Sequence, residues 1–406
     1  MEHDKLIFSK VPTLRFREFI ESWTLIPIKK LLRFQNGINA DSTKYGKGIK
    51  YISVSDILNN QYITYDCIKG LIDIDEKTLN RFIVEYGDIL FQRSSETFED
   101  IGRANVYLDK EHSATFGGFV IRGKKISDYN PLFFRYLLCT HNARKQTVRM
   151  GAGAQHYNIG QEGLEKICLY FPCLQEQQKI SDLLFAIDNK IAVQNKIISD
   201  LKVLKKELCN KLFNSSHCDK TIEIRQVADI HGGYAFNSKA YINDGKYKIV
   251  TIGNVTGDKY ISGDYNRIDI LPDNIQEQQI LNNGDILISL TGNVGRISIV
   301  DGDNYLLNQR VAKLNVKNNL IKAYIYQYLS NSSFEKDMSN AGQGAAQKNI
   351  KNEDILSYNI RIPTSQTYLE KIDGLLSTYD KLIANEERFL LNLNIQKSFL
   401  LNAMFI

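Results

Sequence analysis

The chain has 406 residues, of which 43% are hydrophobic and 24% are charged, and its formal net charge is +5. This length is too great for one ordinary core and predicts two or three domains. The composition is that of a soluble globular protein and excludes collagen-like, low-complexity and disordered classes. The small net charge also excludes a histone-like blanket of basic residues, so any polyanion would be held by local patches.

The expected location follows from what the sequence lacks. It contains no run of 18 or more apolar residues, and the stretch MEHDKLIFSK at its start has no apolar core of a secretory signal. The six cysteines are spread along the chain without a CxxC pair, which argues against a disulfide framework and a four-cysteine zinc site. We therefore expect no membrane contact, no metal site and a cytoplasmic location.

An internal duplication is the most informative feature. GDIL at 87–90 returns at 284–287, and the Gly-Arg pair that follows it ends at Arg103 in the first copy and at Arg296 in the second. Further pairs in the same order are the glycine-rich stretches 151–159 and 342–350, Pro172 and Pro363, and the LL–D–I patterns at 183–191 and 375–383. Between these motifs the copies differ, which indicates one framework with two different inserts, although drift after duplication would give the same pattern.

The predicted elements follow this repeat. Each copy has short apolar strands punctuated by Gly, Asn and Asp, then a helical patch, and then a long helix that starts after a proline. In chain order we expect an N-terminal arm (1–24), a first mixed α/β domain (25–173), a central long helix (174–214), a second mixed domain (215–363) and a C-terminal long helix (364–406).

Both predicted long helices carry a heptad pattern in which positions a, d and e are apolar. Gln194 and Glu386 interrupt the two patterns at equivalent central a positions. If the helices pair antiparallel, these side chains either meet and fix the register or face solvent. The apolar stripe is wide enough to contact more than one neighbour, so we expect part of it to bind partner helices. The candidate partner-binding residues are Ile187, Ile191, Ile198, Leu201, Tyr379, Ile383, Leu390 and Leu393.

Signatures of the common catalytic classes are absent from the sequence. It has no GxxxxGK[ST] phosphate-binding loop and no HExxH or HxxxH metal motif. It also has no Pro-Pro, which excludes the NPPY-type motif of adenine-N6 methyltransferases, and its one Pro-Asp is not followed by the Asp/Glu-x-Lys of PD-(D/E)xK nucleases. We therefore expect no catalytic residues in this chain.

The order of motifs resembles that of the specificity (S) subunit of type I restriction–modification systems. GDIL followed by Gly-Arg, the glycine-rich turn before Asn-Ile, the proline and the LL–D–I pattern occur in both copies. The opening PTLRFREFIESW, with Phe16, Phe19 and Trp23 as apolar anchors, and the helix start LQEQQKI (174–180) are also similar to that family. The second helix start, TSQTYLEKI, departs from the family pattern.

The resemblance implies an α+β fold of two target recognition domains joined by two long antiparallel coiled-coil helices, with an internal pseudo-twofold repeat. It implies a non-catalytic subunit that reads a bipartite target in double-stranded DNA. Such a subunit docks two modification (methyltransferase) subunits and restriction subunits, and S-adenosylmethionine, ATP and Mg belong to those partners, with no cofactor in this chain. A coiled-coil scaffold with two ligand-binding domains not specific for DNA stays open, because the second domain is nearly neutral.

Candidate DNA contacts follow from side-chain chemistry. Phosphate contacts need Lys or Arg, whereas base reading suits Arg on guanine, as for Arg310, and Gln on adenine, as for Gln309. The basic stretch 122–149 is either a phosphate-binding patch or a solvated helix face, and the glycine-rich stretches are either base readers or plain turns. The candidates are Arg93, Ser94, Thr97, Arg103, Lys124, Lys125, Arg144, Lys145, Gln155, His156 and Tyr157 in the first domain, and Thr291, Asn293, Arg296, Gln309, Arg310, Gln347 and Lys348 in the second.

Overall fold

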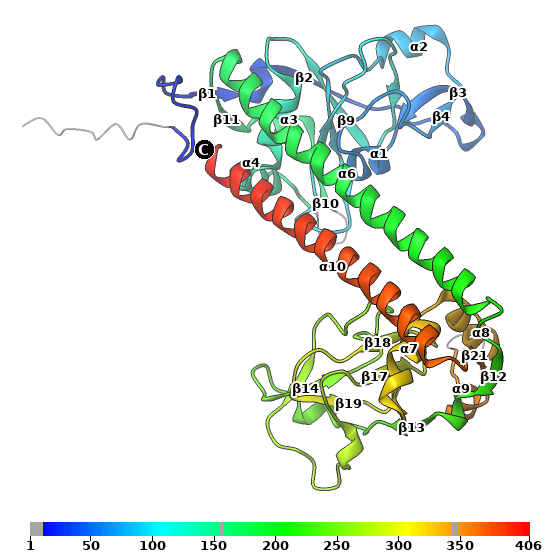
Figure 1. Ribbon diagram of the computed structural model, residues 1–406. Helices are drawn as coiled ribbons and strands as arrows, with labels where there is room; N and C mark the ends of the chain where they lie inside the picture. The colour runs from blue at the N-terminus through cyan, green and yellow to red at the C-terminus, as the bar shows by residue number, and fades with distance from the viewer. Residues whose placement is uncertain (1–10, 154–156, 343–347) are drawn as a thin grey trace, which may run out of the picture. The chain divides into compact units, whose positions relative to one another are not determined.

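The computed structural model describes residues 11–153, 157–342 and 348–406, which fall into two compact units. The first unit holds the described residues up to Gln194 together with Phe389–Ile406, and the second holds Asn195–Arg388. Figure 1 shows both units and labels many of their elements. Each unit combines one mixed α/β domain with parts of two long helices.

The first unit is built around a four-stranded antiparallel sheet. The strands of the whole unit are β1 (Thr24–Pro27), β2 (Leu32–Asn36), β3 (Tyr45–Ile52), β4 (Leu71–Ile72), β5 (Ile89–Gln92), β6 (Ser94–Ser95), β7 (Ala104–Val106), β8 (Thr115–Phe116), β9 (Val120–Lys125), β10 (Tyr157–Asn158) and β11 (Cys168–Phe171). Its short helices are α1 (Val54–Asn59), α2 (Glu76–Arg81), α3 (Pro131–Cys139), α4 (His141–Arg149) and α5 (Gln161–Glu165). The main sheet has the order β2-β9-β5-β7; β3 pairs antiparallel with β4 and parallel with β8, and β1–β11 and β6–β10 are separate pairs.

The second unit repeats this topology. Its strands are β12 (Lys220–Glu223), β13 (Ala228–Gly232), β14 (Tyr247–Val250), β15 (Asn266–Ile268), β16 (Ile280–Leu281), β17 (Ile286–Ser289), β18 (Ile297–Ile299), β19 (Tyr305–Leu307), β20 (Val311–Val316) and β21 (Asn359–Ile362). Its short helices are α7 (Asn319–Leu329), α8 (Ser332–Ala341) and α9 (Asn352–Leu356). The order β13-β20-β17-β18 matches the main sheet of the first unit, and the parallel pair β14–β19 matches β3–β8. The predicted internal repeat is confirmed.

The GDIL motif forms the same turn and the same buried strand in both units. Gly87 and Gly284 have φ values of +91° and +85°, a conformation that favours glycine. The next residue is an aspartate that caps the turn, since Asp88 accepts hydrogen bonds from the backbone N–H groups of Glu85 (3.1 Å) and Lys125 (2.8 Å). The strands that follow, β5 and β17, are buried at all four positions. In each strand three apolar residues are followed by one buried polar residue, Gln92 in β5 and Ser289 in β17.

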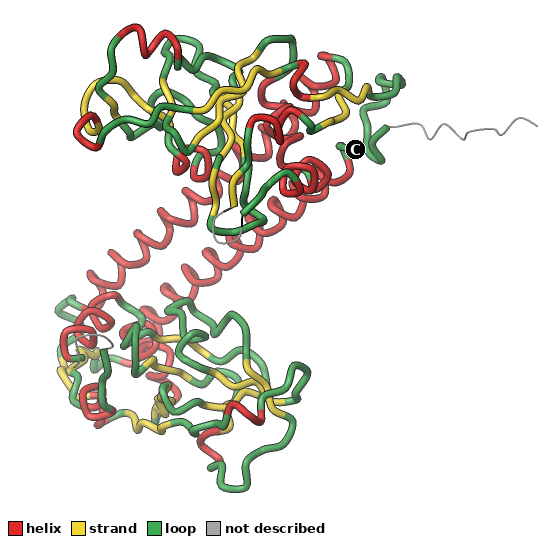
Figure 2. The backbone as a smooth tube through the Cα atoms, turned by 180° about the vertical axis from the view of Figure 1, so that it is seen from behind, coloured by secondary structure: helices red, strands yellow, loops and turns green. Residues whose placement is uncertain are grey.

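The long helices are α6 (Leu174–Phe213) and α10 (Gln366–Ala403), seen along the backbone in Figure 2. In the first unit, Ile180 and Leu184 near the start of α6 belong to the same core as Leu400 near the end of α10. In the second unit, Phe213 at the end of α6 shares a core with Ile372 near the start of α10. The helices therefore run antiparallel.

The N-terminal arm attaches to both long helices within the first unit. Trp23 is 4% exposed, and its ring meets those of Phe133 and Phe405 edge-on at 5.9 and 6.2 Å. Arg15 Nε lies 2.7 Å from the carboxylate of Glu176, which is fully buried. Glu176 belongs to the LQEQQKI stretch, so one task of that stretch is to hold the arm.

Candidate nucleic-acid interface

A loop cluster in the first unit forms directly after the buried strand β5. The chain continues through Arg93 into β6, and β6 pairs antiparallel with β10, which places Ser94 opposite Asn158. The Ser94 hydroxyl donates to Asn158 Oδ1 at 2.5 Å, and Thr97 Oγ1 donates to the Asp100 carboxylate at 2.7 Å. The structure thus brings Arg93, Ser94 and Thr97 to the same place as Tyr157, the first residue of β10.

A turn that the sequence reasoning missed belongs to the same cluster. The turn Gly117–Phe119 connects β8 to β9, and the Arg93 backbone N–H donates to the Phe119 carbonyl at 2.9 Å. The Arg93 guanidinium donates to the Gly118 carbonyl at 3.3 Å. The Gly-Gly pair before an apolar strand was the available signal for this turn. We call Arg93–Thr97, Gly117–Phe119 and β10 together recognition cluster 1.

The second unit assembles the same cluster from equivalent segments. Thr291 forms a bridge with Asn349, and the turn Asn308–Arg310 connects β19 to β20. The Leu290 backbone N–H donates to the Arg310 carbonyl at 3.0 Å, as Arg93 does to Phe119. We call the resulting group recognition cluster 2; its candidate residues are Thr291, Asn293, Gln309, Arg310 and Lys348.

Two glycines show that the turns of the two clusters are equivalent. A Cβ atom on Gly37 would lie 2.1 Å from the carbonyl oxygen of Gly117, and one on Gly233 would lie 2.1 Å from that of Asn308. Only glycine permits so close an approach of two backbones. Position 117 therefore corresponds to position 308, and Phe119 corresponds to Arg310.

The recurring arginines support the loops rather than stand free. Arg103 Nη2 lies 2.6 Å from the Asp100 carboxylate, and Arg296 Nε lies 3.1 Å from that of Glu335. On α4, Arg144 Nη2 donates to the carbonyls of Glu99 (2.8 Å) and Ile101 (2.7 Å), and burial, with a smaller effect from the Arg103 charge, lowers the pKa of Arg144. We assign these three arginines to positioning the loops.

The basic stretch 122–149 does not form one exposed patch. Arg122 is 5% exposed, and its guanidinium donates to Gln35 Oε1 (2.6 Å) and to the Ile83 carbonyl. Lys124, with Nζ 3.2 Å from Glu85, and Lys125 end strand β9, whose other end carries the Phe119 turn. This segment crosses a central strand and the core helix α3 before it reaches Lys145 on α4, so its cations are dispersed.

The glycine-rich stretches are described only in part. The predicted contacts Gln155, His156 and Gln347 lie outside the described residues. Lys348 is described and exposed, and its Nζ donates to the carbonyl (2.9 Å) and hydroxyl (2.7 Å) oxygens of Ser339 on α8.

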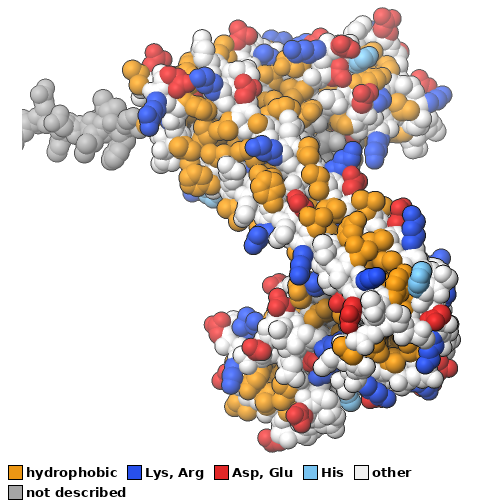
Figure 3. All heavy atoms as spheres, in the orientation of Figure 1, with side chains coloured by type: hydrophobic (Ala, Val, Ile, Leu, Met, Phe, Trp, Pro, Cys, Tyr) orange, Lys and Arg blue, Asp and Glu red, His pale blue; other side chains and the backbone are white. Residues whose placement is uncertain are grey.

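The residues expected to bind partner helices face their own chain. All eight occupy a or e positions of the heptad, and the structure buries Ile187, Ile198, Ile383 and Leu393 and half-buries Ile191, Leu201, Tyr379 and Leu390. Five apolar residues at d positions are exposed instead: Ile197 (40% exposed), Leu204 (51%), Leu375 (42%), Leu382 (41%) and Phe389 (50%). Other exposed apolar residues of the two helices lie at positions c, f and g: Val193, Val203, Leu391, Ile395 and Phe399. Apolar side chains are visible along both helices in Figure 3.

The polar a position of α6 is also settled by burial. Gln194 is 5% exposed, so the solvent-facing alternative is wrong for this residue, whereas Glu386 is half-buried.

The aspartate of the LL–D–I pattern has a role that sequence reasoning missed. In the first unit, Asp188 on α6 is 5% exposed and accepts a hydrogen bond from the Tyr136 hydroxyl of α3 at 2.7 Å. Lys397 of α10 places its Nζ 2.6 Å from the same carboxylate. One buried aspartate therefore ties α6 to the recognition domain and to the other long helix.

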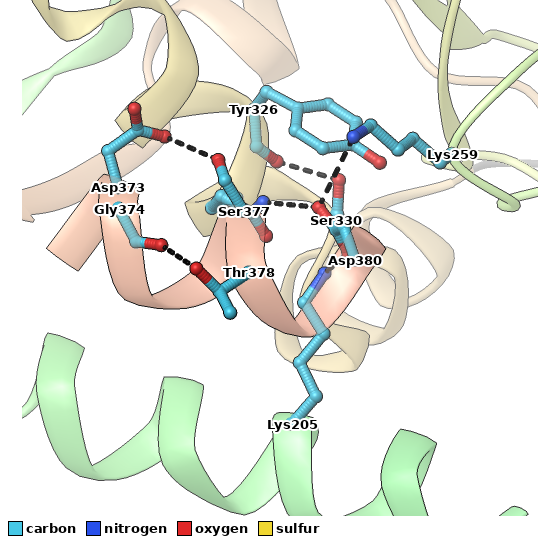
Figure 4. A network of polar contacts seen from close by, with 10 residues as sticks. Lys205, Lys259, Tyr326, Ser330, Asp373, Gly374, Ser377, Thr378 and Asp380 are labelled. Atoms are coloured by element: carbon cyan, nitrogen blue, oxygen red, sulfur yellow. Dashed lines mark hydrogen bonds and ion pairs between the residues drawn. The ribbon is translucent and has the colours of Figure 1, made fainter. Parts of the chain in front are cut away.

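The second unit contains the mirrored arrangement, shown in Figure 4. Asp380 on α10 accepts from Gln327 Nε2 of α7 at 2.7 Å and pairs with Lys205 of α6, while Lys259 Nζ lies 3.8 Å away. The helices have exchanged roles, because the aspartate now comes from α10 and the lysine from α6. An aspartate within an apolar series, repeated in both copies, was the signal for this clamp.

The described residues contain neither a cluster of metal ligands nor a helix suited to cross a membrane. No group of three or more His, Cys, Asp or Glu side chains in the described ranges is arranged to hold a metal ion. Among the helices of those ranges, none combines the length and the apolar character needed to cross a membrane.

With this geometry in hand, comparison with known proteins identifies the family. Residues 21–203 and 220–394 each match the type I restriction modification DNA specificity domain, and the chain belongs to this family. It is similar to the crystal structure of a type I restriction–modification S subunit from M. genitalium (16% identity, TM-score 0.57, 98% of this chain and 99% of that chain). A structure described for complex assembly and conformational transition of the type I R-M system matches with 13% identity and a TM-score of 0.57, over 94% and 96% of the two chains.

These comparisons confirm several predictions. The fold is α+β, with two target recognition domains and two long antiparallel helices. Membership of the specificity family gives the chain a DNA sequence-specificity role in type I restriction–modification and places it among non-catalytic subunits. DNA and restriction–modification subunits are its partners in general terms.

Proposed function

We propose that the chain reads a bipartite DNA target, with recognition cluster 1 reading one half-site and recognition cluster 2 the other. The observation that carries this proposal is that the two clusters share one backbone framework but carry different side chains at the ends of equivalent turns. The turns after β8 and β19 are equivalent, yet one ends in Phe119 and the other in Arg310. Two copies of one reader with different side chains are suited to two different short sequences.

The chemistry of the clusters suits base edges better than it suits phosphates. Hydroxyl and amide groups are provided by Ser94, Thr97, Asn293 and Gln309, and Arg310 is exposed. Arginine takes guanine bidentately and an amide takes adenine in the major groove. Because the net charge is only +5, we assign a modest share of the binding energy to general attraction of phosphates.

We further propose that the exposed d positions of the long helices bind the modification subunits. Leucine and phenylalanine side chains that are about half exposed, repeated every seven residues on a helix, suit a helix-in-groove or helix-pair contact. The internal repeat favours two modification subunits, one for each copy, with restriction subunits added to them in the cytoplasm. S-adenosylmethionine, ATP and Mg would then act in these partners.

The alternative of a coiled-coil scaffold for other ligands has less support, because both copies match a DNA specificity domain.

Co-expression with the type I modification subunit, followed by mapping of methylated adenines, tests the proposal. We expect a stable complex and a split motif with a fixed unspecified gap. A stable complex that methylates an undivided motif, or no motif, would contradict bipartite reading.

A further inference from the structure

Phe119 stands at the tip of recognition cluster 1 and is 69% exposed. An aromatic side chain has a large apolar surface that is normally buried. The apolar residues that follow it on strand β9 behave in this way, since Val120 and Ile121 are fully buried. The exposure of Phe119 is therefore a feature of this position and not of the strand.

The turn that carries Phe119 is rigid. The Gly117 N–H donates to the Ile52 carbonyl at 3.0 Å, and the Val120 N–H donates to the Gly117 carbonyl at 2.9 Å. A Cβ atom on Gly118 would lie 1.7 Å from the Asn39 side-chain oxygen, so neighbours hold the turn tightly on that side. The Phe119 carbonyl is itself bonded to Arg93. The turn thus holds the backbone of Phe119 in place and leaves its ring exposed, as a pre-organised contact group requires.

The equivalent residue of the second unit suggests what the ring contacts. Arg310 occupies the same place on the same framework, and its chemistry suits the O6 and N7 atoms of guanine in the major groove. If the two clusters approach their half-sites in the same way, Phe119 faces the same groove. The apolar group that the major groove offers is the C5-methyl group of thymine.

We propose that Phe119 reads a thymine in the half-site of the first unit, through contact between its ring and the C5-methyl group. This inference rests on the proposed function, because it needs recognition cluster 1 to lie on DNA bases. It makes position 119, with its counterpart 310, a specificity-determining position: an apolar side chain selects thymine and a guanidinium selects guanine.

Replacement of single thymines by deoxyuridine tests the proposal, because deoxyuridine pairs normally and lacks only the methyl group. The complex of the chain with its modification subunit would be titrated with duplexes in which each thymine of the mapped target is replaced in turn. For the wild-type complex we expect one thymine whose replacement weakens binding about fourfold, which corresponds to ~0.8 kcal/mol for one buried methyl group. In the Phe119→Ala complex the same replacement should change nothing.

That thymine should lie in the half-site that Arg310→Ala leaves unchanged. Ile20→Ala is the matched control, because Ile20 is an exposed apolar residue (86%) of the N-terminal arm in the same unit. It should keep the wild-type response to deoxyuridine, and both variants should keep the wild-type melting temperature.

Three results would overturn the reading of thymine. Phe119→Ala could weaken binding equally on every duplex, as expected for a wedge between base steps. It could leave binding unchanged, or the deoxyuridine effect could persist in the variant. In each case wild-type binding to the split target would leave the proposed function intact. A wild-type complex that binds no target sequence would instead remove the basis of both proposals.

Discussion

Arg310 and Arg296 lie in the same unit and differ in what surrounds them. Arg310 is exposed at the tip of a turn, whereas Arg296 is half-buried and paired with Glu335 at 3.1 Å. An exposed side chain at a tip is available to a base, while one held by a carboxylate positions the chain around it.

We predict that Arg310→Ala lowers the affinity for the target by ~1–3 kcal/mol and relaxes specificity in one half-site only. The loss has this size because a bidentate contact to guanine distinguishes that base from the others. Binding to duplexes with each half-site varied in turn measures it. Arg296→Ala is the control, and because this arginine is paired with Glu335 and not exposed at a tip, it should lower the affinity less than Arg310→Ala does. An equal loss on all sequences for Arg310→Ala would mark it as a phosphate contact.

Sequence reasoning found many of the cluster residues but not their grouping. Ser94 and Tyr157 are far apart in sequence, and only the pairing of β6 with β10 brings them together. Phe119 was missed because a phenylalanine next to a strand is usually a core residue, and the Gly-Gly pair before it indicates a turn but not the exposure of the ring. Arg122 shows the opposite case, a charged residue expected at the surface that is buried. Its burial depends on the assembled sheet and cannot be read from the sequence.

At the scale of elements, the two aspartate clamps determine how each long helix sits on its own recognition domain. Asp380 is 8% exposed, and its carboxylate joins α10 to α6 through Lys205 and to α7 through Gln327 (Figure 4). A buried charge that loses its partner is costly, whereas an exposed ion pair contributes little.

We predict that Lys205→Met destabilises the chain by about 2 kcal/mol. This is less than the ~3–5 kcal/mol for a fully buried pair, because Lys259 still lies near the carboxylate. Lys202→Met is the matched control on the same helix, since its pair with Glu387 (2.7 Å) is about half exposed and should contribute less than ~1 kcal/mol. Urea unfolding of both variants measures the difference. Equal destabilisation by the two substitutions would show that the clamp has no special role.

The two long helices show which features a heptad pattern predicts and which it does not. It gave the two long helices and their apolar stripe, because periodicity is local. It could not say which of the positions a, d and e face the partner helix, because that depends on the crossing geometry and on the recognition domain packed against each helix. The structure buries or half-buries the apolar residues at a and e and exposes most of those at d, so the candidate partner-binding surface moves from a and e to d.

On the scale of the whole molecule, substitutions at two neighbouring residues of α10 test complex assembly and chain stability separately. Leu382 is 41% exposed and Ile383 is 9% exposed. We predict that Leu382→Gln weakens binding of the modification subunit about three- to eightfold, since full burial of a leucine is worth ~1.5–3 kcal/mol and about two-fifths of this side chain remains exposed. The stability of the isolated chain should not change. Titration calorimetry with the purified modification subunit measures the affinity.

The control for this prediction is the adjacent residue. Ile383→Ala should lower the free energy of unfolding by ~2–5 kcal/mol, because it leaves a cavity in the chain's own packing. If Leu382→Gln instead destabilised the chain and left the affinity unchanged, the d positions would be part of the fold and not a docking surface.

The central claim is that two equivalent clusters read two half-sites independently. The most direct test is a comparison of methylated-adenine maps for two double variants, Ser94→Ala/Thr97→Ala in cluster 1 and Asn293→Ala/Gln309→Ala in cluster 2, each with the modification subunit. We predict that each variant relaxes a different half-site and leaves the other half-site and the gap unchanged. A variant that alters both half-sites, or a pair that alters the same one, would contradict the account.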